Sequence, residues 1–204
     1  MTARNGGGRE CGRPAMERWV GPEFQFCPWC GTRLVLRAKG GTNRSYCGPC
    51  GEFFYRNPTV GVAVLLLEGE SVLLVRRLGS SFSGKWCIPC GHVEWNEDVR
   101  EAAQREFLEE TGIEVALGPV FDVQSNFHDP ERQTVGVWFW GERSGGVLEP
   151  GPEVSDVRFF PLRDLPGEMA FPTDVVVCGK LAERIGKEGP GERGVKSRRS
   201  RGRP

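Results

Sequence analysis

Three glutamates, Glu106, Glu109 and Glu110, are spaced one, three and four residues apart in a segment with helical periodicity. On a helix these spacings place like charges on one side, and each such pair costs roughly 0.2–0.5 kcal/mol even when it is exposed. A bound divalent cation removes this repulsion, and clustered carboxylates suit magnesium or manganese better than zinc. The alternative is a solvated acidic helix face, which is what such a cluster usually means when it stands alone.

The helix that carries these glutamates is predicted to begin at Asn96, a good N-cap, and to end before Gly112. Its apolar stripe begins with Val99, Ala102 and Ala103. At helical spacing, the next positions of this stripe are occupied by Glu106 and Glu110. A purely structural helix would carry Leu or Ile at those two positions, so the pattern favours a function for the carboxylates.

Three neighbouring residues favour a metal site over an acidic surface. Gly91 lies in the tight segment Pro89-Cys90-Gly91-His92, where backbone carbonyls can reach a metal, and Glu97 follows Gly91 by six residues. Arg105 comes four residues after Glu101, the spacing of an ion pair that would fix the helix.

Together these positions resemble the Nudix box: Gly91, five residues, Glu97, seven residues, and then Arg105-Glu106-Phe107-Leu108-Glu109-Glu110-Thr111-Gly112-Ile113. Nine defined positions at fixed spacing make a specific motif. The resemblance extends over about residues 57–171. It implies an α/β fold, the Nudix α/β/α sandwich with a mixed sheet, and magnesium-dependent hydrolysis of a diphosphate linkage, with manganese as the alternative ion.

The resemblance also implies roles for individual residues. The expected magnesium ligands are the carboxylates of Glu106, Glu109 and Glu110 and the backbone carbonyl of Cys90. Arg105 is expected to orient a glutamate and Glu97 to support the loop. The general base is either a glutamate of the box or a carboxylate outside it, for which Glu153 is the candidate; an ordinary loop glutamate is an equal alternative at that position.

Four cysteines form two matching knuckles, Cys27-Pro28-Trp29-Cys30 and Cys47-Gly48-Pro49-Cys50. Four thiolates at this spacing predict a closed, structural zinc site in a small ribbon, and two redox dithiols are the weaker alternative. Similar ribbons precede the catalytic domain in Nudix enzymes that act on NADH, FAD or ADP-ribose. A third pair, Cys87 and Cys90, is interpreted as packed thiols, because residues three apart on a strand point to opposite faces.

The segment after the box is expected to select the substrate. Phe127 and Trp138 are the candidates to stack on a substrate base, although such aromatic residues are more often part of a core. NADH-cleaving relatives carry a Ser-Gln-Pro-Trp-Pro-Phe-Pro run here, and this chain does not. ADP-ribose is therefore the first expected substrate, followed by FAD, NADH and nucleoside triphosphates. The alternatives are an RNA-end pyrophosphohydrolase and a Nudix-fold nucleic-acid-binding regulator.

The chain is expected to divide into four segments, two of which position these sites. We expect a flexible N-terminal segment over residues 1–24, the zinc ribbon over 25–52, the Nudix hydrolase domain over 57–186 and a disordered basic tail over 187–204. In the catalytic domain, strands are predicted at 60–67, 71–76, 86–89, 113–124 with an interruption at Gly118-Pro119, 134–140 and 154–160, and a closing helix at 174–185.

The charge distribution and the apolar runs indicate which kinds of partner the chain can contact. The tail carries seven basic and two acidic residues in a chain of zero net charge, so weak nonspecific contact with nucleic acid is expected there. Nothing in the sequence indicates the base-stacking platform that sequence-specific recognition of a nucleic acid needs. The longest apolar run is too short to span a membrane, and the first twenty residues lack the apolar stretch of a signal peptide. We therefore expect a cytoplasmic enzyme with a small nucleotide substrate and no membrane contact, and a homodimer stays open.

Overall fold

The computed structural model describes residues 24–79, 82–129 and 132–187. Its contacts divide the chain into two compact units, unit 1 ending at Asn57 and unit 2 beginning at Pro58. Residues 1–23 of the expected N-terminal segment and residues 188–204 of the expected tail lie outside the described part.

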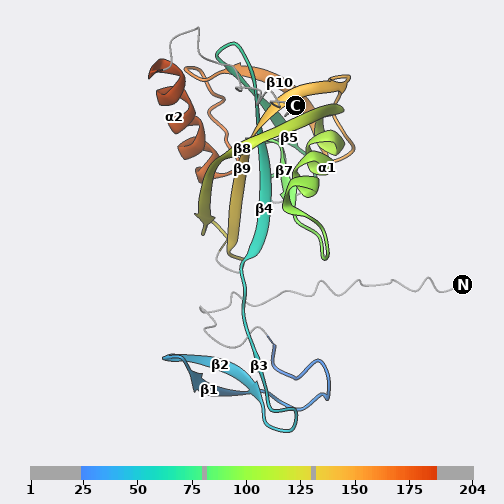
Figure 1. The fold of residues 1–204 in the computed structure, drawn as a ribbon, viewed down its shortest axis with the longest axis vertical. Coiled ribbons are helices and arrows are strands. Elements are labelled where there is room, and N and C mark those ends of the chain that lie inside the picture. The colour runs from blue at the N-terminus through green and yellow to red at the C-terminus, as the bar shows by residue number, and fades with distance from the viewer. Residues whose placement is uncertain (1–23, 80–81, 130–131, 188–204) are drawn as a thin grey trace, which may run out of the picture. The chain divides into compact units, whose positions relative to one another are not determined.

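Unit 1 is a small antiparallel sheet in the order β1-β2-β3 (Figure 1). Its strands are β1 (Val35–Lys39), β2 (Thr42–Cys47) and β3 (Glu52–Phe54). Buried Cys27, Leu34 and Cys47 form its core, with Cys50 and Phe54 packed against them. A core of this size is too small to hold a domain together alone, so the cysteines must contribute more than packing.

Unit 2 is built around a seven-stranded sheet whose main path runs β10-β5-β4-β9-β8, with β6 paired to β5 and β7 paired to β4. The strands are β4 (Thr59–Glu68), β5 (Ser71–Arg77), β6 (Trp86–Cys87), β7 (Cys90–His92), β8 (Ile113–Asn126), β9 (Thr134–Gly146) and β10 (Val154–Pro161). The pair β4–β9 is parallel and the other pairs are antiparallel, so the expected mixed sheet is confirmed.

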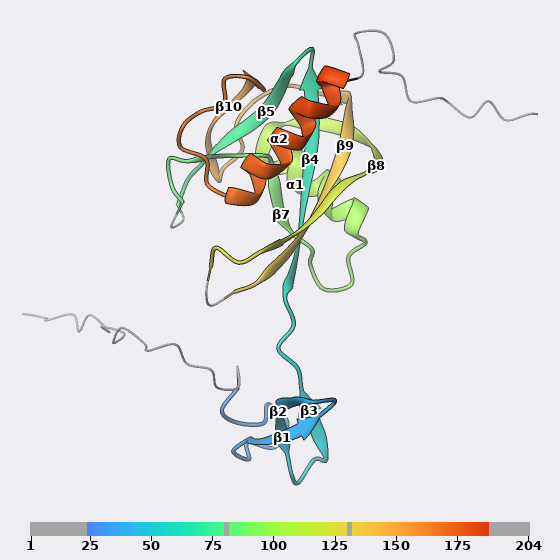
Figure 2. The ribbon, with the colours of Figure 1, turned by 90° about the vertical axis from the view of Figure 1, so that its left-hand side faces the viewer.

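Helices α1 (Val99–Thr111) and α2 (Pro172–Lys187) flank the sheet from opposite sides (Figures 1 and 2). Strand β4 contributes side chains to the cores on both faces of the sheet, because successive side chains of a strand point to opposite faces. Val62, Val64 and Leu66 join the cluster under α1, whereas Ala63 and Leu65 join the cluster under α2. Two separate cores therefore share one central strand.

The structure differs from the sequence expectation along β8. The Gly118-Pro119 pair was expected to interrupt this strand, but pairing with β9 continues past it with register shifts on both sides of Val120. Proline removes one amide donor, and an irregular register accommodates that loss without ending the strand. In the described part of the chain, neither helix is long and apolar enough to span a bilayer.

Candidate active site

Helix α1 starts three residues later than the sequence suggested. The N-cap is Asp98, whose carboxylate accepts from the Arg100 amide at 2.8 Å, whereas Asn96 has a positive φ of 64° and lies in the preceding turn. Asparagine tolerates this left-handed conformation, which explains why a good N-cap residue is used as a turn residue instead. The C-terminal end is as expected, with Gly112 in the left-handed conformation and its amide donating to the Leu108 carbonyl.

Arg105 connects the helix to the loop before it. Its Nε and Nη2 donate to the two carboxylate oxygens of Glu97 at 2.7 and 2.9 Å, and Nη2 also donates to the His92 carbonyl at 3.2 Å. Nη1 lies 2.9 Å from Glu106 and 3.3 Å from Glu109. The Arg105 guanidinium holds the pKa of Glu97 at about 2, well below its usual value. The expected ion pair of Arg105 with Glu101 is thus wrong, and Glu97 takes that place. The planar guanidinium can donate to both oxygens of the Glu97 carboxylate at once.

Gly91 lies directly under the Glu106 side chain. A Cβ at this position would be 1.9 Å from the Glu106 carboxyl carbon, so an added side chain would displace that carboxylate from its present position. Glu106 is thereby brought against the β7 backbone.

Glu110 turns into the protein and is only 8% exposed. Its Oε2 accepts from the Cys90 amide at 2.8 Å. Burial raises the pKa of the Glu110 carboxyl to about 8, against the opposing effects of the Cys90 amide and of Arg77; the negative charges of Glu106 and Glu153 raise it further. A buried carboxylate facing other carboxylates favours a cation in the same region.

The register of β4 and β7 fixes the direction of the Cys90 backbone groups. The Val64 amide donates to the Pro89 carbonyl at 3.2 Å, and the next pair along is Ala63–Cys90. Because hydrogen-bonded pairs alternate in antiparallel strands, the Cys90 amide and carbonyl both point away from β4. The amide donates to Glu110, so the carbonyl emerges on the same side as the glutamates of α1.

The three carboxylates lie against different parts of the protein, although Glu106 and Glu109 share Arg105. Glu110 is held by the Cys90 amide, Glu106 lies against Gly91, and Glu109 is on the outer side with its side chain 58% exposed. Within the described residues, only a group of cysteines has three or more potential metal-ligand atoms within 4.8 Å of one another. The glutamates thus surround a region rather than form a closed cage.

Glu153 lies close enough to Glu110 to raise its pKa, so the structure brings this residue to the box. The loop that carries it is packed tightly on the end of α1: the Gly151 amide donates to the Glu110 carbonyl at 3.1 Å, and a Cβ on Gly151 would be 1.7 Å from the Glu109 carbonyl oxygen. The Glu153 carbonyl also accepts from the Leu78 amide at 2.8 Å.

Two charged residues near the site, one buried and one half-buried, were not singled out from the sequence. Asp174, in the first turn of α2, is 1% exposed and accepts from the Ile88 amide at 3.0 Å. Burial raises its pKa to about 7. Arg77, at the end of β5, acts on both Glu110 and Asp174 by lowering their pKa values. Their sequence signals were weak, since an acid in a first helical turn and an arginine at a strand end are both common.

Cys87 and Cys90 are packed thiols, as interpreted from the sequence, but the argument about opposite strand faces is wrong. Both belong to one cluster, and the Cys87 thiol raises the pKa of Cys90. The residues between them, Ile88 and Pro89, separate β6 from β7, so the two cysteines do not share one regular strand.

The two aromatic candidates for base stacking have different positions. Phe127 is 70% exposed beyond the end of β8 and is accessible to a ligand. Trp138 is 4% exposed within the cluster under α2, and a Cβ on Gly136 would be 2.6 Å from its ring. This buried position does not fit the expected stacking role of Trp138. His128 contacts the rings of Phe82 and Phe171, with centroids 5.1 and 5.2 Å away.

The four cysteines of unit 1 lie together. Their sulfur atoms are all within 4.8 Å of one another, with Cys27 and Cys50 3.9 Å apart and Cys30 and Cys47 3.5 Å apart. Four sulfurs at about 2.3 Å from one tetrahedral zinc ion would be separated by about 3.8 Å. The cluster therefore fits a metal ion of that kind.

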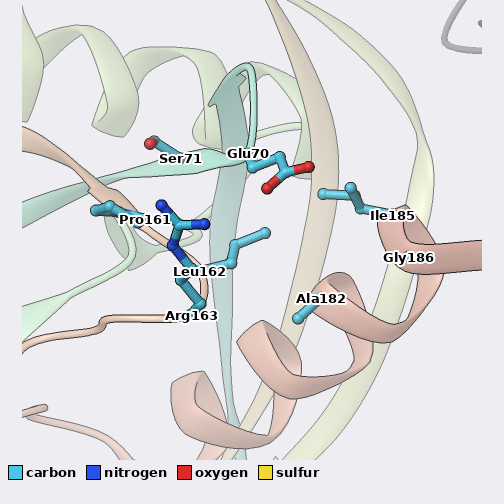
Figure 3. Close-up of a pocket in the computed structure, with 8 residues that line it drawn as sticks. All are labelled: Glu70, Ser71, Pro161, Leu162, Arg163, Ala182, Ile185 and Gly186. Carbon is cyan, nitrogen blue, oxygen red and sulfur yellow. The ribbon is translucent and has the colours of Figure 1, made fainter. Parts of the chain in front are cut away.

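A shallow hollow of about 280 Å³ lies elsewhere in unit 2, between the C-terminal half of α2 and the turn after β4 (Figure 3). It is lined by Glu70, Ser71, Pro161, Leu162, Arg163, Ala182, Ile185 and Gly186. No residue of the box contributes to it, so it is separate from the glutamate site.

Comparisons with known proteins agree with this site. The family model of the NUDIX domain matches residues 56–177 of this chain. The ADP-ribose pyrophosphatase of Methanocaldococcus jannaschii is 32% identical over 124 residues, covering 60% of this chain and 73% of that protein. The NAD-capped RNA hydrolase NudC of Stutzerimonas stutzeri is 30% identical over 179 residues, covering 84% of this chain and 61% of that protein. The chain thus spans about three-fifths of that relative, and the aligned region is longer than unit 2 alone.

Among solved structures, a NUDIX hydrolase from Nitrosomonas europaea matches with a TM-score of 0.72 and 30% identity, covering 82% of this chain and 95% of that one. The domain match covers more than half of the chain, and Arg105 connects the box glutamates of α1 with Glu97 in the loop before the helix. This chain belongs to the Nudix hydrolase family.

Proposed function

We propose that this chain hydrolyses the diphosphate linkage of a nucleoside diphosphate derivative with magnesium, and that ADP-ribose is the first candidate substrate. The observation that carries the proposal is the meeting of Glu106 and Glu110 with the β7 backbone, where Gly91 makes room for one carboxylate and the Cys90 amide binds the other. Hydrolysis of ADP-ribose would give AMP and ribose 5-phosphate.

The donor set fits magnesium or manganese. Glu106, Glu109, Glu110 and the Cys90 carbonyl would hold the ions, all through the hard oxygen donors that these cations prefer. Bound there, divalent ions neutralise the diphosphate and lower the pKa of an attacking water. Arg105 keeps Glu106 and Glu109 in place while its other end holds Glu97, so the loop and the helix keep a fixed spacing.

Glu153 is our candidate to accept the proton of the attacking water. It lies outside the group of proposed metal ligands and within electrostatic reach of Glu110. A carboxylate with that position can act on a water without giving up a metal ligand. In the balanced reaction, water adds to one phosphorus, the bridging P–O bond breaks, and the water's protons are shared between the base and the leaving phosphate.

The substrate choice rests on the named relatives. The ADP-ribose pyrophosphatase of Methanocaldococcus jannaschii supports ADP-ribose. FAD, NADH and nucleoside triphosphates are the next candidates, on the family resemblance alone. A second candidate, NAD-capped RNA, is favoured by the alignment with NudC, which reaches into the cysteine-rich unit. The intact box argues for an enzyme over a regulator that has lost catalysis.

In unit 1 we propose a structural zinc ion bound by Cys27, Cys30, Cys47 and Cys50. Four protein ligands complete a tetrahedral site and leave no position for a reacting water. The ion would supply the stability that the three-residue core cannot.

Glu109→Gln tests the catalytic assignment, because Glu109 is exposed and its replacement removes a charge with little effect on packing. We expect turnover to fall about a hundredfold or more at saturating magnesium, corresponding to ~2.7 kcal/mol in the barrier. Glu153→Gln should lower kcat while leaving the magnesium dependence unchanged. Monophosphate release from ADP-ribose, NADH, FAD, triphosphates and capped RNA measures both effects. Near-normal turnover of Glu109→Gln on every substrate would reject the proposed site.

A further inference from the structure

One face of the unit 1 sheet carries alternating cations and aromatic rings. Arg37 is paired with Arg44 across β1 and β2, and Tyr46 with Phe53 across β2 and β3. Since alternate residues of a strand share a face, these side chains lie on the same side of the sheet. Together with Lys39 and Tyr55, which contact them, they form what we call the aromatic–basic face: Arg37, Lys39, Arg44, Tyr46, Phe53 and Tyr55.

The members of this face contact one another closely. The Arg37 guanidinium lies 4.7 Å from the centroid of the Tyr46 ring, and the Tyr46 and Phe53 centroids are 4.7 Å apart. The Lys39 ammonium is 4.5 Å from the Phe53 ring and 5.7 Å from the Tyr55 ring. The Arg44 guanidinium lies 4.7 Å from the Tyr55 ring. Rings and cations therefore follow one another without a gap across all three strands.

The charge on this face is of one sign. Within residues 24–57, Glu52 is the only acidic residue, and it pairs with Cys47, on the side of the sheet opposite to Tyr46 and Phe53. The positive charges of Arg37 and Lys39 are exposed, and Tyr55 is 45% exposed. The face thus presents cations and a ring to solvent with no carboxylate among them.

We propose that the aromatic–basic face binds single-stranded RNA. Cations spaced along a sheet match a phosphodiester backbone, and neighbouring rings and guanidinium planes match unstacked bases. A duplex does not expose its bases for stacking. A single strand is therefore the form of RNA that can contact both the cations and the rings of the face. The sequence alone did not suggest this platform, because its members come from three strands and meet only through the register.

The competing explanation is that these contacts only stabilise a small domain. Residues 24–57 hold four cation–π contacts, all of them on this face, whereas the much longer remainder of the described chain holds six. Exposed pairs of this kind contribute little stability each, so stability alone is a weak reason for so many. The exposure of Arg37, Lys39 and Tyr55 and the single charge sign of the face are what a surface for a polyanion requires.

The choice of RNA over DNA rests on the second candidate function, the hydrolysis of NAD-capped RNA. Among the candidate substrates, this one combines a diphosphate linkage with a polynucleotide. Binding itself does not depend on which substrate unit 2 hydrolyses. A probe with no diphosphate linkage therefore separates the two proposals.

The test uses the full-length chain and a fluorescein-labelled, unstructured 20-nucleotide RNA with a 5′-hydroxyl, followed by fluorescence anisotropy. The variant combines Arg37→Gln, Lys39→Gln and Tyr55→Leu, all at exposed positions, so the fold of unit 1 should be kept. Arg33→Gln is the matched control, because Arg33 is exposed and precedes β1. Zinc content and ADP-ribose hydrolysis are measured on each protein and should stay within about twofold of wild type.

We expect the Kd of the triple variant to rise at least about tenfold and that of Arg33→Gln to change less than about twofold. The slope of log K against log salt should decrease by about 1.4 in the triple variant, since each of two lost phosphate contacts accounts for about 0.7 on a single strand. Equal binding by wild type and the triple variant would overturn the proposal, as would equal competition by a decaglutamate peptide. Tighter binding of the same sequence as DNA would overturn the choice of RNA. The hydrolase assignment would survive each of these results.

Discussion

Replacing Glu110 by Gln should abolish turnover and, without magnesium, stabilise the protein at alkaline pH. The carboxylate of Glu110 is buried, and burial raises its pKa from the ordinary 4.5 to about 8. A folded-state pKa above the unfolded-state value means that the folded protein binds more protons, so stability falls as the pH rises from about 4.5 to about 8. Gln keeps the shape and can still accept from the Cys90 amide, but it has no charge to bury.

The size of the effect follows from the shift. One pKa unit corresponds to about 1.4 kcal/mol, so the cost of ionising Glu110 approaches about 4 kcal/mol at pH 8 and stays below about 1 kcal/mol at pH 5. Rotation of the side chain toward solvent reduces this cost. We therefore expect Glu110→Gln to increase the free energy of unfolding by about 1–3 kcal/mol at pH 8, with little gain at pH 5.

Urea unfolding at pH 5 and pH 8, in buffer free of magnesium and of chelators, measures this difference through tryptophan fluorescence. Unit 2 dominates that signal, since Trp86, Trp95, Trp138 and Trp140 all belong to it. Glu109→Gln is the matched control: it changes the same residue type on the same helix at an exposed position, so its stability should depend on pH as in wild type. Magnesium should stabilise wild type more than Glu110→Gln. An equal change in stability at both pH values would show that the buried charge of Glu110 is not costly.

Three further predictions concern other parts of the chain. Gly91→Ala would place a Cβ where the Glu106 carboxylate lies, so ADP-ribose turnover should fall at least about tenfold while circular dichroism stays unchanged; normal turnover would contradict the close approach. Purified protein should contain about one zinc per chain by atomic absorption, and Cys47→Ser should lose it while unit 2 keeps hydrolysing ADP-ribose; a folded but inactive Cys47→Ser would give the ribbon a catalytic part. Deleting residues 187–204 should change ADP-ribose turnover by less than about twofold, and a larger loss would mean that the tail contributes to the small-molecule site.

The residues of the box could be recognised in the sequence because their signal is local. The spacing of Gly91, Glu97 and Arg105 with the glutamates is contained in twenty residues and predicts the fold. It did not predict the ion pair of Arg105, which forms with Glu97 and not with Glu101. The detailed ends of elements were less predictable. Asn96 and Asp98 are both good N-caps two residues apart, and only the turn that leads into the helix decides between them.

Features that depend on residues distant in sequence could not be predicted. Asp174 binds the Ile88 amide across 86 residues, and no pattern near either residue signals that contact. The aromatic–basic face requires a particular strand register, since a shift of one residue would move Tyr46 to the other side of the sheet. Trp138 illustrates the same limit: its residue type suits both stacking and packing, and only its place under α2 decides for packing.

The contact between Asp174 and Ile88 has a consequence for the order of events during synthesis. The ribosome completes the whole Nudix box long before it makes α2, because the box ends at Ile113 and α2 begins at Pro172. Until α2 emerges and packs, the Ile88 amide lacks its carboxylate, and the segment that leads to Cys90 and Gly91 lacks that anchor. A nascent chain, or a product truncated before Pro172, would contain every residue of the motif but would lack this hydrogen bond to the segment before Cys90. The Ile88 contact is thus made later than the pairing of β4 with β7, whose residues are all synthesised before α2.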